Sequence, residues 1–171
     1  MMRTRFTPHA AMLAGVLLAA ALSAGAQDGA TYSVLALKPA VALELANATQ
    51  AACRARDYQV TVAVVDRAGL PQVALRDQLA GNFTWTVALA KARTAAGFRQ
   101  PTLGLARAMG DRPELGVLHQ VDDVMMVGGG VPIEAAGVVI GALGVSGAPT
   151  PEADHACAEA GLESIAEQLL F

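Results

Sequence analysis

The longest apolar pattern after the first thirty residues runs through positions 128–147, GGGVPIEAAGVVIGALGVSG. It predicts a strand, a turn at Ala135–Gly137 and a second strand whose run VVIGALGV has no polar side chain. A strand of that kind is normally covered on both faces. We therefore expect the rest of the chain to pack against the two sides of this hairpin.

A second hairpin is predicted upstream. The segment VTVAVVD at 60–66 is β-branched on both alternating faces, and the turn at 66–69 leads back into PQVALRD at 71–77. Helical patterns begin at Pro39, Thr84, Thr102 and Pro151, with Thr84 as the expected cap of the second helix. A short strand is expected at 124–127, whereas positions 110–123 are polar and predict irregular structure.

This order of elements predicts an α+β fold, an antiparallel sheet with the first and last helices packed together on one face. The apolar stripe of the first helix follows helical spacing at Val41, Leu45, Ala48 and Ala52. Cys53 falls beside that stripe, and Cys157 lies at the edge of the stripe on the last helix. We predict a disulfide between Cys53 and Cys157; the alternative is a contact between two small buried thiols.

The helix predicted at 84–98 has two occupied faces. One face, which we expect to cover the sheet, consists of Trp85, Leu89, Ala92 and Ala96. The other mixes apolar and polar groups, namely Val87, Lys91, Thr94 and Phe98. This second face is typical of a ligand site, a contact with another subunit, or burial beneath a loop, and the pattern alone does not choose among them.

The first residues have the pattern of an export signal. Arg3 and Arg5 precede an apolar stretch at 10–22, and the small residues at 24–26 match a cleavage site. The stretch is shorter than the ~20 residues of a membrane span. We predict a signal peptide at 1–26, a single domain at 27–171, and a periplasmic or secreted protein with no membrane span after cleavage; an uncleaved anchor is the alternative.

Composition narrows the choice of partners. The chain has a net charge of −3 and no polybasic stripe, which argues against nucleic acid. The hydrophobic share is 54% but the aromatic share only 4%, which indicates a core of Val, Ala and Leu. So high an apolar fraction also favours a homo-oligomer with apolar surface buried between subunits.

Two familiar catalytic patterns are present only in part. The glycines of 141–147 recur at the wrong spacing for a dinucleotide loop, and no βαβ unit follows them. Ser146, Asp154 and His155 stand in hydrolase order, but Pro149 separates the serine from the helix that a nucleophile elbow requires. We expect neither chemistry.

His119 is the remaining candidate for metal or acid–base chemistry. It shares a polar segment with Asp122 and Asp123, where an imidazole and a carboxylate can converge. Three solvated surface residues are the simpler interpretation. The other histidine after residue 26, His155, is predicted to be exposed on the last helix.

Three segments together resemble one family, the GlcG-like haem-binding proteins. They are VTVAVVDRAG at 60–69, KARTAAGFRQPT at 91–102 and GGGVPIEAAGVVIGALGVSGAPTPEADHACAEAG at 128–161. The resemblance covers essentially all of 27–171 and implies a profilin-like α+β fold and a tendency to form homo-oligomers. For some members it also implies haem binding outside the cytoplasm, in certain cases with slow haem degradation.

The chain departs from the family where the central helix begins. Many members have Gly-Pro-His-Thr there, and this chain has Gly81-Asn82-Phe83-Thr84. Phe83 cannot coordinate iron, so His119 becomes the candidate metal ligand, unless haem binds weakly or the ligand is another flat apolar molecule. The other candidate haem contacts lie on or after the central helix: Lys91, Arg93, Thr94, Phe98 and Arg99.

We therefore expect an exported haem-binding protein with no clear catalytic constellation. The alternative is a structural or accessory homo-oligomer without a role in haem binding.

Overall fold

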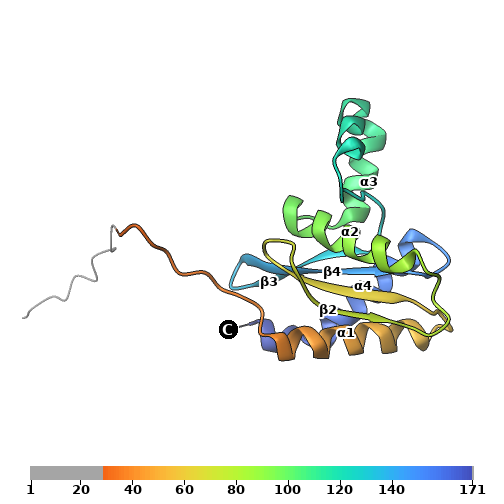
Figure 1. Ribbon diagram of the computed structural model, residues 1–171, viewed down its shortest axis with the longest axis horizontal. Coiled ribbons are helices and arrows are strands. Elements are labelled where there is room, and N and C mark those ends of the chain that lie inside the picture. Colours follow the sequence, from red (N-terminus) through yellow and green to blue (C-terminus); the bar gives the residue numbers. More distant parts are fainter. Residues whose placement is uncertain (1–28, 171) are drawn as a thin grey trace, which may run out of the picture. The chain divides into compact units, whose positions relative to one another are not determined.

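The computed structural model describes residues 29–170 (Figure 1). The predicted signal peptide at 1–26 lies outside the described residues. Contacts divide the chain into a unit of residues 1–33, of which 29–33 contain no helix or strand, and a domain from Val34 to Phe171. Among residues 29–170, no helix is long and apolar enough to cross a membrane.

The domain contains four strands, four α-helices and two short 3₁₀ helices within the described residues. In chain order they are α1 (Pro39–Arg54), β1 (Thr61–Asp66), β2 (Pro71–Arg76), α2 (Thr84–Phe98), α3 (Thr102–Asp111), η1 (Pro113–Gln120), β3 (Gly130–Ala135), β4 (Val138–Ser146), α4 (Pro151–Ser164) and η2 (Ala166–Leu169). The predicted α+β fold is confirmed.

The strands form one antiparallel sheet in the order β2-β1-β4-β3. Both predicted hairpins are present, and β4 pairs with β1 so that Ala63 lies opposite Gly144. In the first turn the Asp66 carboxylate accepts hydrogen bonds from the backbone of Ala68 and Leu70. In the second, Ala136 and Gly137 both have positive φ, as the tightest hairpin turns require.

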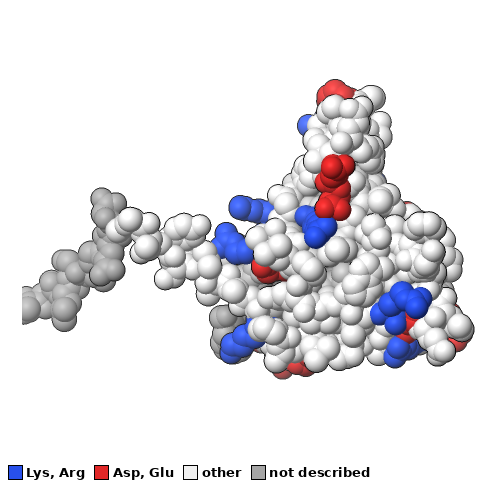
Figure 2. Space-filling model, in the orientation of Figure 1, with Lys and Arg blue, Asp and Glu red and all other residues white. Residues whose placement is uncertain are grey.

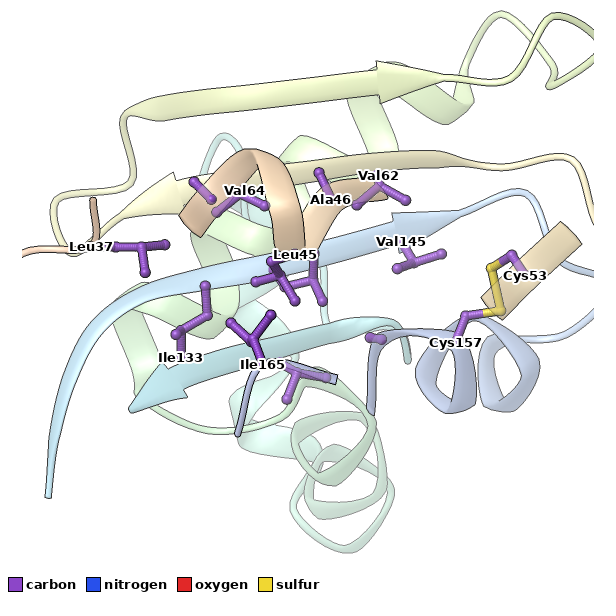
Figure 3. Packing of buried hydrophobic residues seen from close by; sticks show 14 of the residues in the cluster. Leu37, Leu45, Ala46, Cys53, Val62, Val64, Ile133, Val145, Cys157 and Ile165 are labelled. Carbon is purple, nitrogen blue, oxygen red and sulfur yellow. A yellow bond between two sulfur atoms is a disulfide. The ribbon is translucent and has the colours of Figure 1, made fainter. Parts of the chain in front are cut away.

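Helices α1 and α4 cover one face of the sheet and enclose the larger core (Figure 3). Leu45 and Ile165 pack there against the strand residues Val64, Ile133 and Val145.

The buried face of α1 is rotated from the predicted stripe. Leu45 is buried as expected, but the other stripe residues are only partly buried, because Thr49 and Cys53 face α4, at Gly161 and Cys157. The buried residues of α1 are Ala42, Leu45, Ala46, Thr49, Gln50 and Cys53. Cys53 therefore lies within the interface, 5.3 Å from Cys157 between Cα atoms, and the predicted disulfide is present.

Helix α2 covers the opposite face. Ala92, Ala95 and Ala96 pack there against Val65 and Ala142, so the contact consists almost entirely of small side chains.

The start of α2 differs from the prediction in two respects. Trp85 was expected to cover the sheet, but its side chain is 46% exposed, since the small residues of α2 fill the contact. Thr84 was expected to cap the helix but is its first residue, and its hydroxyl donates to the Gly81 carbonyl.

Helix α3 and η1 form an arm that stands away from the sheet above α2 (Figure 1). Residues 113–120, predicted to be irregular, form the 3₁₀ helix η1. The strand predicted at 124–127 is absent, because the backbone NH of Met125 donates to the Thr94 hydroxyl of α2 instead of to a neighbouring strand. Met126 is nevertheless buried.

The contact between α2 and β4 depends on Gly144. A Cβ atom at this position would overlap the Ala88 carbonyl oxygen and lie 2.7 Å from the Ala92 nitrogen. We expect Gly144→Ala to destabilise the protein by about 3 kcal/mol, measured by chemical denaturation, because α2 must move off the sheet.

Gly104, on α3, provides the matched control. Apart from its chain neighbours and the surrounding helix backbone, no atom lies within 4 Å of a Cβ built there, so Gly104→Ala should be neutral or stabilise the helix by up to about 1 kcal/mol. Equal stabilities of the two variants would contradict the close approach of α2 to β4.

Candidate functional site

Lys91 and Asp154 form an ion pair inside the domain. The Lys91 ammonium lies 2.7 Å from Asp154 Oδ2 and donates a second hydrogen bond, 3.0 Å long, to the Val145 carbonyl. The other oxygen of Asp154 accepts from the backbone NH of Ala148. Both side chains are buried, so the pair joins α2 to the end of β4 and the start of α4.

The environment of Asp154 shifts the pKa of its carboxyl group. Burial raises the pKa of Asp154 above its ordinary value of 3.8, and attraction to the Lys91 ammonium opposes that rise. Because the Lys91 ammonium already has internal partners, it is not exposed to a ligand at the surface.

Thr94 also has internal partners. Its hydroxyl donates to the Ala90 carbonyl and accepts from the NH of Met125, each over 2.8 Å. The residue is 2% exposed. Two of the five candidate contacts on α2 and after it, Lys91 and Thr94, therefore hold the domain together.

Arg93 connects three segments at the surface. Its guanidinium donates to the Gly69 carbonyl in the turn between β1 and β2, and lies 2.7 Å from the Asp123 carboxylate. The side chain remains 31% exposed. Arg93 thus fixes the turn and the segment that follows η1 against α2, while part of its side chain stays open to solvent.

Phe98 and Arg99 lie at the C-terminal end of α2. Phe98 is the last helical residue and is 37% exposed. Arg99 ends the helix in a left-handed conformation with φ of 55°. Its side chain is exposed, and no carboxylate of residues 29–170 lies within salt-bridge distance of it.

The surface around this helix end is hollowed. A hollow of about 250 Å³ is lined by the turn at 67–70, Arg93 and Gly97. A second, of about 300 Å³, lies between Arg67, Arg99 and the β3–β4 hairpin at Glu134 and 137–139.

A third and smaller hollow is lined by Arg67, Ala96, Gly97, Arg99 and Val139, and so shares residues with both of the others. We call the three together the arginine cleft. Figure 2 shows basic side chains on this face, around the end of α2 that lies nearest the turn between β1 and β2.

Sequence reasoning missed Arg67 and Glu134. Arg67 was interpreted only as a turn residue and Glu134 only as a strand residue. A basic residue in a turn gives no signal by itself, since the pairing of β1 with β4 is what brings the two hairpin turns to the same end of α2.

His119 lies on η1 in the arm and is exposed. It does not line the arginine cleft. Within residues 29–170, no three His, Cys, Asp or Glu side chains come together as a metal site. The expectation that His155 is exposed was wrong, because its side chain is only 13% exposed and contacts Glu159 over 3.2 Å.

Comparison with known proteins shows the family to which the chain belongs. The model of the haem degrading HbpS-like proteins matches residues 37–163. The chain belongs to the HbpS-like family. The family resemblance expected from the sequence is thereby confirmed.

Relatives of this HbpS-like protein are similar along most of their length. An uncharacterized 15.0 kDa protein of Citrobacter freundii, encoded in the dhaT-dhaS intergenic region, is 33% identical over 130 residues, 75% of this chain and 91% of the relative. The crystal structure of a double mutant of Streptomyces reticuli HbpS is 30% identical with a TM-score of 0.76, covering 92% of this chain and 99% of that one. A crystal structure of a PduOC:heme complex is 27% identical with a TM-score of 0.70, covering 77% and 96%.

The ion pair of this HbpS-like chain makes a prediction about pH. We expect Lys91→Met to cost about 3 kcal/mol at neutral pH, because it leaves the Asp154 carboxylate buried without its partner. An acid whose pKa is raised by folding contributes stability that is fully present below its unfolded pKa and is lost as pH rises through the folded pKa. Removing Lys91 raises the pKa of Asp154 further, so the cost should be smaller at about pH 4, where the carboxyl is protonated.

Denaturation curves at the two pH values measure this difference. The double variant Lys91→Met/Asp154→Asn is the control; it should be more stable than Lys91→Met alone and less sensitive to pH. A cost of Lys91→Met that is the same at both pH values would show that the Asp154 carboxylate is not its cause.

Proposed function

We propose that this HbpS-like protein binds haem, or a related flat tetrapyrrole, at the surface around the C-terminal end of α2. The observation that carries the proposal is the family match over residues 37–163, supported by the relative whose structure is described as a haem complex. We further propose that the predicted signal at 1–26 directs it to the periplasm or out of the cell.

The residues around the arginine cleft fit the peripheral groups of haem. Haem has a flat apolar ring and two propionates, and arginine is the side chain best suited to carboxylates. Arg99 supplies a guanidinium group without a carboxylate partner among residues 29–170, and Arg93 one that is partly exposed beside Asp123. Phe98 supplies an exposed aromatic ring at the helix end, outside the three hollows. These three members of the predicted set remain in the proposed site, whereas Lys91 and Thr94 act inside the domain.

The ligand of the haem iron is the second question for this site. The predicted iron ligand, His119, is exposed on the arm and lines none of the hollows of the arginine cleft, so it could reach the iron only from a part of the ring that extends beyond the cleft. When bound, haem supplies redox chemistry at its iron, and the residues of this chain bind and orient the macrocycle.

A second candidate function is that of a homo-oligomeric accessory protein without haem. Exposed apolar side chains favour it, on the arm and its return (Val117, Val121) and at the start of α2 (Phe83, Trp85). Surfaces of this kind commonly pack against another subunit. In this alternative the apolar groups of α2 serve assembly and not ligand binding.

Titration with hemin tests the primary proposal. We expect a saturable Soret band, and Phe98→Ala should weaken binding about fivefold because an aromatic contact with the ring is lost. Phe83→Ala is the matched control, since Phe83 is 77% exposed just before the other end of the same helix. His119→Ala should change the absorption spectrum if its imidazole coordinates the iron.

The absence of any saturable band would overturn haem binding. Light scattering with and without hemin then separates the alternatives, because a large assembly that is indifferent to hemin is the result expected of the accessory oligomer.

A further inference from the structure

Two guanidinium groups of the arginine cleft have no carboxylate within salt-bridge distance among residues 29–170. Arg67 projects from the turn between β1 and β2, and Arg99 from the end of α2, and both line the same two hollows. Both residues are exposed, whereas Lys91 is buried with its ammonium bound to internal partners. Free arginines on two separate elements can each hold one carboxylate of a ligand.

The surface next to these guanidinium groups is apolar. Leu70 is 62% exposed beside the first hollow, and Val138 is 48% exposed beside the second. Gly97 and Val139 line the smallest hollow, which shares Arg67 and Arg99 with the second. The cleft therefore offers positive charge beside aliphatic surface, which suits a molecule that is flat, apolar and carries two carboxylates.

The lining offers little to a metal ion. It contains no histidine, cysteine, methionine or tyrosine among the described residues, and Glu134 is its one carboxylate. The candidate axial ligand His119 does not line it. Recognition at this place must then depend on the periphery of the ligand.

Two features of the cleft oppose an anion. Glu134 lies next to Arg67 and Arg99 along the second hollow. The C-terminal end of α2 also carries the negative pole of the helix dipole. Of the other acidic groups nearby, Asp123 is paired with Arg93, and Asp66 accepts hydrogen bonds from the backbone of its own turn.

We infer that Arg67 and Arg99 recognise the two carboxylates of an amphipathic tetrapyrrole, so that the cleft binds the metal-free dicarboxylate about as well as haem. This inference rests on the proposed function but concerns the part of the ligand that is recognised. The Glu134 carboxylate repels the carboxylates of the ligand and so lowers its affinity.

Three ligands separate the contributions of charge and iron. They are hemin, protoporphyrin IX, and protoporphyrin IX dimethyl ester, which has the same ring without the free carboxylates. We expect the first two to bind within about threefold of each other and the ester about tenfold more weakly, since charge-assisted hydrogen bonds are lost.

Matched variants locate the site. Arg67→Gln and Arg99→Gln should each weaken binding of protoporphyrin IX about fivefold, while leaving the weaker binding of the ester unchanged. Arg56→Gln is the control, because Arg56 is exposed and lies outside the cleft. Glu134→Gln should tighten binding about twofold. Thermal melting of each variant verifies that the fold is intact.

The outcomes distinguish this inference from the proposal on which it rests. Binding of hemin without binding of protoporphyrin IX would overturn carboxylate recognition and leave the haem-binding function standing. Binding of both that is insensitive to Arg67→Gln and Arg99→Gln would place the ligand elsewhere and overturn the inference. Binding of none of the three would overturn both.

Discussion

The close approach of α2 to β4 is the contact on which the proposed ligand-binding side of this protein depends. Because Gly144 has no side chain, the backbone of α2 at Ala88 and Ala92 can lie directly against the strand. Alanines along α2 extend this contact towards its end. The helix is thus held flat on the sheet, and its C-terminal end arrives between the two hairpin turns.

Everything polar that α2 carries towards the interior is used to hold this position. Lys91 reaches Asp154 and the end of β4, and Thr94 holds the backbone of Met125. On the other side of the sheet the disulfide joins α1 to α4. The arginines of the cleft without a carboxylate partner among residues 29–170 are therefore those beyond the helix end, Arg67 and Arg99, which project from separate segments.

Local patterns were sufficient to predict the two hairpins, the order of the helices and the disulfide. They could not predict which face of α1 is buried, because its contact with α4 is made by Thr49 against Gly161, a residue distant in sequence. The predicted haem contacts also include residues whose role depends on a partner distant in sequence. Lys91 is internal because its partner, Asp154, comes 63 residues later, and no local pattern around Lys91 indicates that partner.

The return of the chain from the arm was likewise set by a long-range contact, the hydrogen bond from Met125 to Thr94 that replaces the predicted strand. The place of Arg67 in the cleft was not predicted, because it depends on where the end of α2 lies. Both cases concern contacts between segments distant in sequence, which periodicity and spacing do not encode.

The ligand is proposed to lie at the end of α2 between the two turns. Backbone NMR spectra recorded during a titration with protoporphyrin IX test it most directly, because shifts of amide signals report where the ring lies. We expect the largest changes at residues 67–70, 96–99 and 134–139. Changes confined to the arm at 102–120, or to the apolar hollow lined by Leu35, Val41 and Leu169, would contradict it.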